Sequence, residues 1–174
     1  LPNRSLLYSQ LEQAIDDMTL RGGQLAVMVI DIDRFKEVND ALGNKAGDLV
    51  LREYARRLGA AVRSGDIVGR LGGDQFMVVL LHCDARGVAM VGKHLRNEMV
   101  RDMQVESQTL AMTVSAGISL FPDNGRDINT LTKHAEFALA QAKEEGRNRS
   151  RFFSPTLNQQ AKEKRALELD LRRA

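Results

Sequence analysis

The sequence predicts an α+β domain in which helices surround a mainly antiparallel sheet. Two observations lead to this fold class. Segments with helical and strand-like periodicity follow one another in the order helix, strand, helix, hairpin, helix, strand and helix. Two of the strands are joined only by a short glycine-containing turn, and short hairpins mixed with longer connections are typical of α+β domains.

The first elements alternate between helix and strand. Residues 5–20 carry apolar side chains at helical spacing, and a glycine pair follows them as a stop signal. Residues 25–32 are almost continuously apolar, which is typical of a strand buried on both faces. We expect Asp33 to N-cap a short helical turn, residues 41–47 to form a glycine-containing loop, and residues 48–62 to form a helix.

A β-hairpin and a further helix come next. Residues 67–71 and 76–81 are apolar runs that read as two strands. Gly72-Gly73 between them suits a tight turn, because paired glycines tolerate positive φ. Residues 85–100 then return to helical spacing.

The last part of the domain is predicted to contain three elements. Residues 109–120 are expected to form a long strand, and residues 127–145 an alanine-rich helix that ends at a C-cap glycine, Gly146. Residues 151–153 read as a last short strand.

Both ends of the chain suggest a piece of a longer protein. It begins with Leu1 rather than with methionine. Residues 154–174 have a proline at position 155 and continue as a charged helical segment with little apolar face. We therefore expect one domain over residues 1–153, followed by a helical connector to another domain.

Composition narrows the function classes. The 25 basic and 23 acidic residues give a formal net charge of +2, so no charge excess favours nucleic-acid or membrane binding. Cys83 is the only cysteine, which excludes an internal disulfide and fits a reducing compartment. The apolar runs are too short to span a bilayer, and no signal peptide is visible.

Acidic residues stand at the ends of two predicted strands. Asp31 and Asp33 close the first strand, and Asp74 lies at the tip of the hairpin. Two adjacent strands with an acid at each tip can share two metal ions, as in polymerases and cyclases. The alternative is that Asp31 and Asp33 only cap and terminate local structure, which the Asp-x-Asp pattern alone slightly favours.

The residue after Asp74 is an amide, Gln75. A site for divalent metal is expected to carry an acid there, because Mg²⁺ favours anionic oxygen ligands. The pattern indicates a nucleotide enzyme that has given up its chemistry.

Several motifs resemble those of the GGDEF domain, the diguanylate cyclase family, and they occur in order from residue 1 to about residue 153. The matching stretches are LPNR at 1–4, DIDRFK at 31–36 with Asn39 and Asp40, Gly43 with Gly47 and Asp48, RLGGDQF at 70–76, VSAGIS at 114–119, and Ala142 and Lys143 with GRN at 146–148.

The resemblance implies a fold similar to adenylyl cyclase and polymerase palm domains, with a ferredoxin-like βαββαβ core. Active family members condense two GTP molecules into cyclic di-GMP. Two protomers face each other, and each brings one GTP and two Mg²⁺ or Mn²⁺ ions.

The resemblance also implies roles for individual residues. Metal is expected at Asp31 and the Ile32 carbonyl. The GTP-binding residues implied are Phe35 and Lys36 through their amides, Asn39 and Asp48 at the guanine, Asn44, Gly72, Gly73, and Lys143 and Arg147 at the phosphates.

Two of these assignments depend on local detail. Lys143 and Arg147 share a helix face if the helix persists through Gly146; the alternative is a solvated basic helix end favoured by the helix dipole. Asn44 stands where many members have histidine, and it can still donate a hydrogen bond.

The catalytic positions show the main departure from the family. Asp74 occupies the third signature position, which is thought to help activate the attacking 3′-hydroxyl. Gln75 occupies the fourth, where the family has a metal-binding glutamate. Its neutral carbonyl oxygen is a poor ligand for a divalent ion, so we expect a weakened metal site and impaired catalysis.

Arg63 and Asp66 stand at the spacing of the family's inhibitory cyclic di-GMP site, Arg-x-x-Asp, ahead of Gly72. The alternative is a helix end followed by a turn. A further family arginine aligns with His94, which lowers the expected affinity for the product.

Three functions follow from the resemblance. The first is a regulatory module that binds GTP or cyclic di-GMP and controls an adjoining EAL-type phosphodiesterase domain. The second is an active diguanylate cyclase, and the third is a homodimerisation scaffold without nucleotide binding. Each implies a cytoplasmic domain that does not bind nucleic acid, and attachment of the parent protein to the inner membrane stays open.

Overall fold

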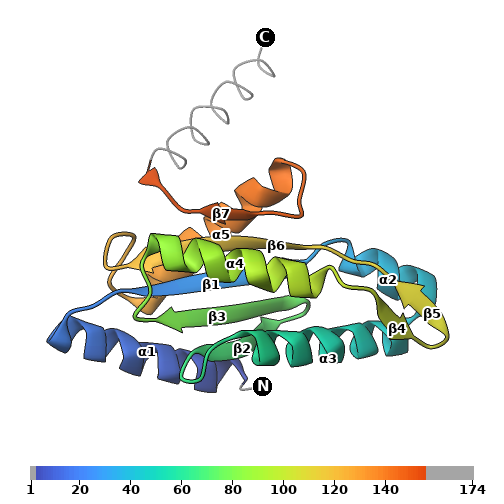
Figure 1. Cartoon of the computed structure of the whole chain (residues 1–174), viewed down its shortest axis with the longest axis horizontal. Helices are drawn as coiled ribbons and strands as arrows, with labels where there is room; N and C mark the ends of the chain where they lie inside the picture. The colour runs from blue at the N-terminus through green and yellow to red at the C-terminus, as the bar shows by residue number, and fades with distance from the viewer. Residues whose placement is uncertain (1–2, 156–174) are drawn as a thin grey trace, which may run out of the picture.

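A computed structural model describes residues 3–155 of the chain (Figure 1). Most of the predicted connector lies outside the described residues. Within residues 3–155, no helix is long and apolar enough to cross a bilayer.

The structure confirms an α+β fold built on a five-stranded sheet. The strand order is β2-β3-β1-β6-β7, and every neighbouring pair is antiparallel except β6 and β7. The strands are β1 (Leu25–Ile32), β2 (Ile67–Gly72), β3 (Gln75–Leu81), β6 (Val114–Phe121) and β7 (Ser150–Phe152).

Helices cover both faces of this sheet (Figure 1). One face packs against α1 (Arg4–Arg21) and α5 (Ile128–Glu144). The other packs against α3 (Asn44–Ala61) and α4 (Ala85–Met99), and the short α2 (Phe35–Leu42) links β1 to α3.

Strand β1 is buried along its whole length, as its apolar run predicts. Alternate side chains point to opposite faces of a strand. Ala26 and Met28 therefore join the core under α3 and α4, while Val27 and Val29 join the core under α1 and α5. Two packed layers hold β1 in place, so the acidic residue near its end has a fixed position.

The prediction of a loop over residues 41–47 was wrong. Helix α2 continues to Leu42 and α3 begins at Asn44, so only Gly43 separates them. Gly43 has a φ of 91°, a conformation that glycine adopts without steric cost, and a single residue is therefore enough to redirect the chain.

The prediction that Asp33 caps the following helix was also wrong. The N-cap position of α2 belongs to Arg34, whose φ is 60° and whose side chain makes no capping hydrogen bond. The Asp33 carboxylate instead accepts hydrogen bonds from Thr113 and Ser115 across the sheet.

The long strand predicted over residues 109–120 is divided in the structure. A separate hairpin of β4 (Met103–Val105) and β5 (Gln108–Leu110) precedes β6. Glu106 and Ser107 have φ values of 48° and 70°, which turn the chain back on itself within two residues.

Glycine ends α5, as expected. The Gly146 and Arg147 amides donate to the carbonyls of Lys143 and Ala142, the hydrogen-bond pattern of a Schellman motif. Because α5 ends at Glu144, the condition under which Lys143 and Arg147 would share a helix face is not met.

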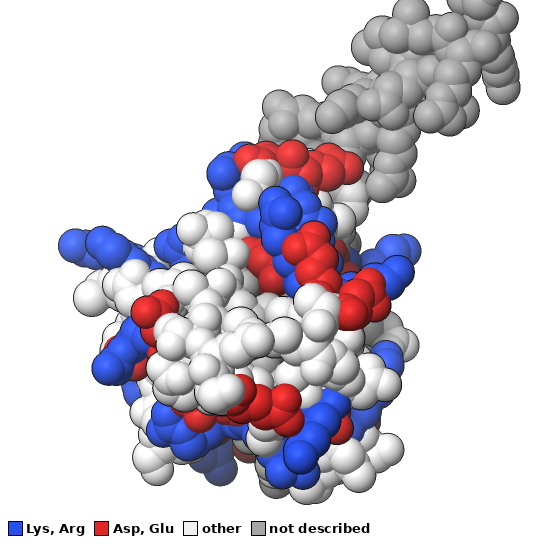
Figure 2. Space-filling view, turned by 90° about the vertical axis from the view of Figure 1, so that its right-hand side faces the viewer, with Lys and Arg blue, Asp and Glu red and all other residues white. Residues whose placement is uncertain are grey.

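Charged side chains of both signs are interspersed on the face shown in Figure 2, with no large patch of a single sign. This surface agrees with the small net charge of the chain.

Candidate functional site

The site forms where β1 ends beside its two neighbouring strands. Asp31 lies directly opposite Gln75 of β3 and opposite Ser115 of β6. The register of the central sheet therefore brings the first-strand acid and the hairpin residues together, as the sequence predicts.

Asp31 is a buried carboxylate with unequal oxygens. Its Oδ2 accepts from the ammonium group of Lys143, which reaches over from α5. Its Oδ1 is buried and has no hydrogen-bond partner among the described residues. A buried, unpaired anionic oxygen is costly unless a cation or donor approaches it.

Asp74 sits in the turn between β2 and β3, beside Asp31. Partial burial, followed by the hydrogen bond and the negative charge of Asp31, raises the pKa of Asp74 to about 6, although Lys143 opposes this rise. The Asp31 carboxylate therefore disfavours the charged form of Asp74.

Two oxygens at the end of β1 suit a divalent ion. Asp31 Oδ1 is a free anionic ligand, and the Ile32 carbonyl follows it in the chain. Gln75, opposite Asp31, supplies a neutral amide, which is a weaker ligand for a divalent ion than a carboxylate. Residues 3–155 contain no cluster of three or more His, Cys, Asp or Glu side chains arranged to hold a metal.

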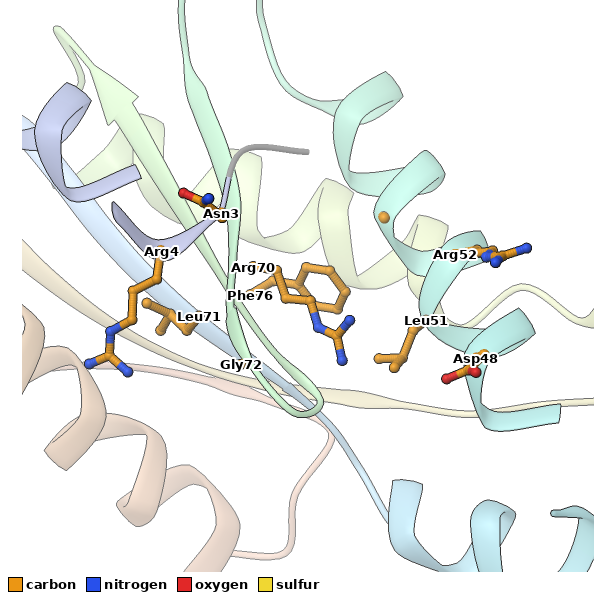
Figure 3. Close-up of a pocket in the computed structure, with 10 residues that line it drawn as sticks. Asn3, Arg4, Asp48, Leu51, Arg52, Arg70, Leu71, Gly72 and Phe76 are labelled. Atoms are coloured by element: carbon orange, nitrogen blue, oxygen red, sulfur yellow. The ribbon is translucent and has the colours of Figure 1, made fainter. Parts of the chain in front are cut away.

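A cavity of about 640 Å³ opens between α3 and the hairpin (Figure 3). Asp48 lines it on the α3 side, and Gly72 lines it on the hairpin side. The arginines Arg4, Arg52 and Arg70 also line it, and sequence reasoning assigned them no role. The only available signals were the positions of Arg4 and Arg70 within motifs.

Asn39 lies in α2, with its side chain against Gly47 of α3. A side chain on Gly47 would overlap the Asn39 amide, so the absence of one lets the two helices approach. Asp48 follows Gly47 in α3. The structure thus places Asn39 and Asp48, the two predicted guanine-binding residues, on adjoining helices.

The other predicted nucleotide contacts begin helices or turns. Phe35 and Lys36 are the first residues of α2, where backbone amides lack intrahelical partners. Asn44 begins α3, and Gly73 lies in the hairpin turn, where its carbonyl accepts from Arg70 at 2.6 and 3.0 Å.

Arg63 and Asp66, the predicted product-site pair, form an ion pair with each other. Arg63 Nε donates to Asp66 Oδ2 at 3.1 Å, and its Nη2 donates to the Leu81 carbonyl at 2.7 Å. The side chain of Arg63 is 53% exposed, so a ligand can reach it. His94 lines a hollow between α3 and α4 that does not include Arg63, and the two residues make no hydrogen bond to each other.

The family model described as "Diguanylate cyclase, GGDEF domain" matches residues 1–149. The chain is 42% identical, over 99% of its length, to an uncharacterized signaling protein of Caulobacter vibrioides. It is 38% identical, over its whole length, to the bifunctional diguanylate cyclase/cyclic di-GMP phosphodiesterase MucR of Pseudomonas aeruginosa.

The chain spans 22% and 25% of the lengths of these two relatives, respectively. Among solved structures, the GGDEF domain of YfiN (TpbB) from Pseudomonas aeruginosa superposes with a TM-score of 0.85 at 35% identity. That match covers 88% of this chain and 97% of the other.

Proposed function

Because this chain belongs to the GGDEF family of diguanylate cyclase domains, we propose that it is a cyclic di-GMP signalling domain with impaired cyclase activity. In this proposal it binds GTP or cyclic di-GMP and regulates an EAL-type phosphodiesterase domain in the same parent chain.

The main support for the proposal is that Gln75 of β3 lies directly opposite Asp31 of β1 in the sheet. Phosphoryl transfer depends on positioning and on neutralising charge at the phosphates. Asp31 is the only carboxylate of the Asp31–Gln75 pair, so the pair carries less negative charge to hold metal ions. Lys143 already pairs with one oxygen of Asp31. Losing the second anionic ligand is expected to cost about 3 kcal/mol of barrier, or about a hundredfold in rate.

Binding of GTP is compatible with the remaining groups. Asp31 and the Ile32 carbonyl would hold one Mg²⁺ or Mn²⁺ ion, which supplies positive charge to the phosphates when bound. Asp48 can accept from guanine N1–H and the 2-amino group, and the Asn39 amide can donate or accept. The cavity of about 640 Å³ lies within the size range of small-molecule sites.

An active diguanylate cyclase is the second candidate, favoured by Asp74. Its carboxyl group lies beside Asp31 with a pKa of about 6, suited to accepting a hydroxyl proton near neutral pH. A relative that is 34% identical over 94% of this chain is the diguanylate cyclase TpbB of Pseudomonas aeruginosa. Such activity requires two protomers that face each other.

The attached phosphodiesterase domain is proposed from the names of the relatives. MucR combines both activities in its name, and NbdA of Pseudomonas aeruginosa, 36% identical over the whole chain, is named a cyclic di-GMP phosphodiesterase. Residues 154–174 then form the connector between the domain at residues 1–153 and its neighbour.

Calorimetry with cyclic di-GMP tests the nucleotide-binding part of the proposal. We expect the domain to bind cyclic di-GMP, and Arg63→Ala to lower the affinity at least about tenfold, because the variant removes the phosphate- or guanine-binding fork. Arg56→Ala is the matched control: Arg56 also pairs with a nearby carboxylate, that of Glu53, but on the α3 surface.

Unchanged affinity in Arg63→Ala would rule out this product site. Absence of binding to both GTP and cyclic di-GMP at millimolar concentration would instead support a dimerisation scaffold. Thermal denaturation of both variants shows whether losing the Arg63 hydrogen bond to Leu81 disturbs the fold.

A further inference from the structure

Asp33 has no assigned role in nucleotide binding, yet its buried carboxylate collects three hydrogen bonds. Thr113 Oγ1 donates to Oδ2 at 2.5 Å, and Ser115 Oγ donates to Oδ1 at 2.7 Å. The backbone amide of Asn148 donates to Oδ2 at 3.0 Å. Asp33 thus joins the end of β1 to the start of β6 and to the turn between α5 and β7.

That turn has an uncommon backbone. Arg147 and Asn148 have φ values of 63° and 50°, immediately after Gly146 at 120°. Left-handed φ is rare for residues other than glycine, and it persists where surrounding contacts determine it. Two such residues in succession therefore need specific support.

The support comes from three hydrogen bonds in sequence. The Arg147 amide donates to Ala142 at the end of α5, at 3.0 Å. The Asn148 amide donates to Asp33, and the Arg149 carbonyl accepts from Ala116 of β6 at 2.9 Å. Asp33 is the side-chain acceptor in this series, and it lies more than a hundred residues earlier in the chain.

The turn carries Arg147, one of the predicted phosphate contacts. The side chain of Arg147 is exposed and makes no hydrogen bond or ion pair among residues 3–155. Lys143, the other side chain predicted to contact phosphate, is already paired with Asp31. Recognition of phosphate at this side of the site therefore depends on where the turn places Arg147.

The groups that donate hydrogen bonds to Asp33 are all neutral. Two hydroxyls and an amide satisfy its carboxylate, and no cation among residues 3–155 pairs with it. Asp33 can therefore fix the turn without drawing the Arg147 guanidinium into an ion pair of its own.

We propose that Asp33 is a positioning residue for nucleotide phosphates: it holds the Asn148 amide so that Arg147 faces the triphosphate of a bound nucleotide. The inference rests on the proposed binding of GTP. It predicts that Asp33 and Arg147 act as a unit on the phosphate part of the ligand and leave guanine recognition to Asn39 and Asp48.

A double-mutant cycle tests this inference, with dissociation constants for GTP and for guanosine measured in the presence of Mg²⁺. We expect Asp33→Ala and Arg147→Ala each to weaken GTP binding about tenfold, as expected for loss of a charge-assisted contact. The double variant should be no weaker than either single one, because the two changes remove the same contact. Guanosine affinity should stay unchanged.

Asp33→Asn keeps the shape of the side chain and one acceptor oxygen, so it should restore most of the affinity lost in Asp33→Ala. If Asp33→Ala does not fold, Asp33→Asn replaces it in the double-mutant cycle. Asp127→Ala is the matched control, because Asp127 is exposed and its side chain caps no amide in α5.

Additive losses in the double variant, or equal losses for GTP and guanosine, would overturn the positioning role. If Arg147→Ala left GTP affinity unchanged, the positioning role would fall while GTP binding stood. If the wild-type domain bound no GTP, both the inference and GTP binding would fall.

Discussion

Replacing Gln75 by glutamate is expected to raise cyclic di-GMP production by about a hundredfold, which corresponds to about 3 kcal/mol of barrier. The variant places a second carboxylate directly opposite Asp31 across β1 and β3, which completes an anionic pair for divalent ions. The measurement is product formation from GTP with Mg²⁺ or Mn²⁺. Gln10→Glu is the matched control, since it makes the same change on an exposed position of α1.

The same variant has a readout that does not depend on activity. Two like charges placed opposite each other across strands are destabilising without a cation. Added Mg²⁺ should therefore raise the melting temperature of Gln75→Glu more than that of the wild type, because a ligand that binds the native state stabilises it. If neither turnover nor metal-dependent stability increases, the defect lies elsewhere in the site, and Lys143 beside Asp31 is the first residue to test.

Gly117→Ala is expected to destabilise the domain by about 3 kcal/mol or more, at the upper end of the range for overpacked sites. Gly117 lies in the middle of β6, and a side-chain carbon there would overlap the backbone of Ala135 and Leu139 in α5. Backbone atoms of a helix cannot move aside as a flexible side chain can. Because α5 also carries Lys143 to Asp31, displacement of the helix should weaken GTP binding as well.

Urea denaturation measures this effect, with Gly59→Ala as the control. Gly59 lies in α3 with no atom in the way of a side chain, so alanine should stabilise the helix by about 0.5–1 kcal/mol. Equal stability of Gly117→Ala and the wild type would show that α5 does not rest directly on β6.

The elements that could be predicted from the sequence have strong local signals. The apolar run of β1 gave its bounds, Leu25–Ile32, without error. The hairpin was placed within a residue, because a glycine pair between two apolar runs leaves few alternatives. The loop over residues 41–47 failed because Gly43 alone makes the connection between two helices.

The candidate site, like the fold, could be predicted only in part from the sequence. Asp31, Asp74 and Gln75 could be brought together from the sequence, since adjacent strand tips meet at one edge of the sheet. The contacts of Asp33 could not, because its partners Thr113 and Asn148 lie 80 and 115 positions away in the chain. Such contacts depend on tertiary packing and leave no local pattern in the sequence.

We propose that Gln75 impairs cyclase activity in a domain whose nucleotide site is otherwise retained. The most direct test incubates the purified wild-type domain with GTP and Mg²⁺ or Mn²⁺ at a concentration that permits dimers, and quantifies cyclic di-GMP. We predict at most trace product, about a hundredfold below Gln75→Glu. Robust production of cyclic di-GMP by the wild-type domain would contradict the claim and identify an active diguanylate cyclase.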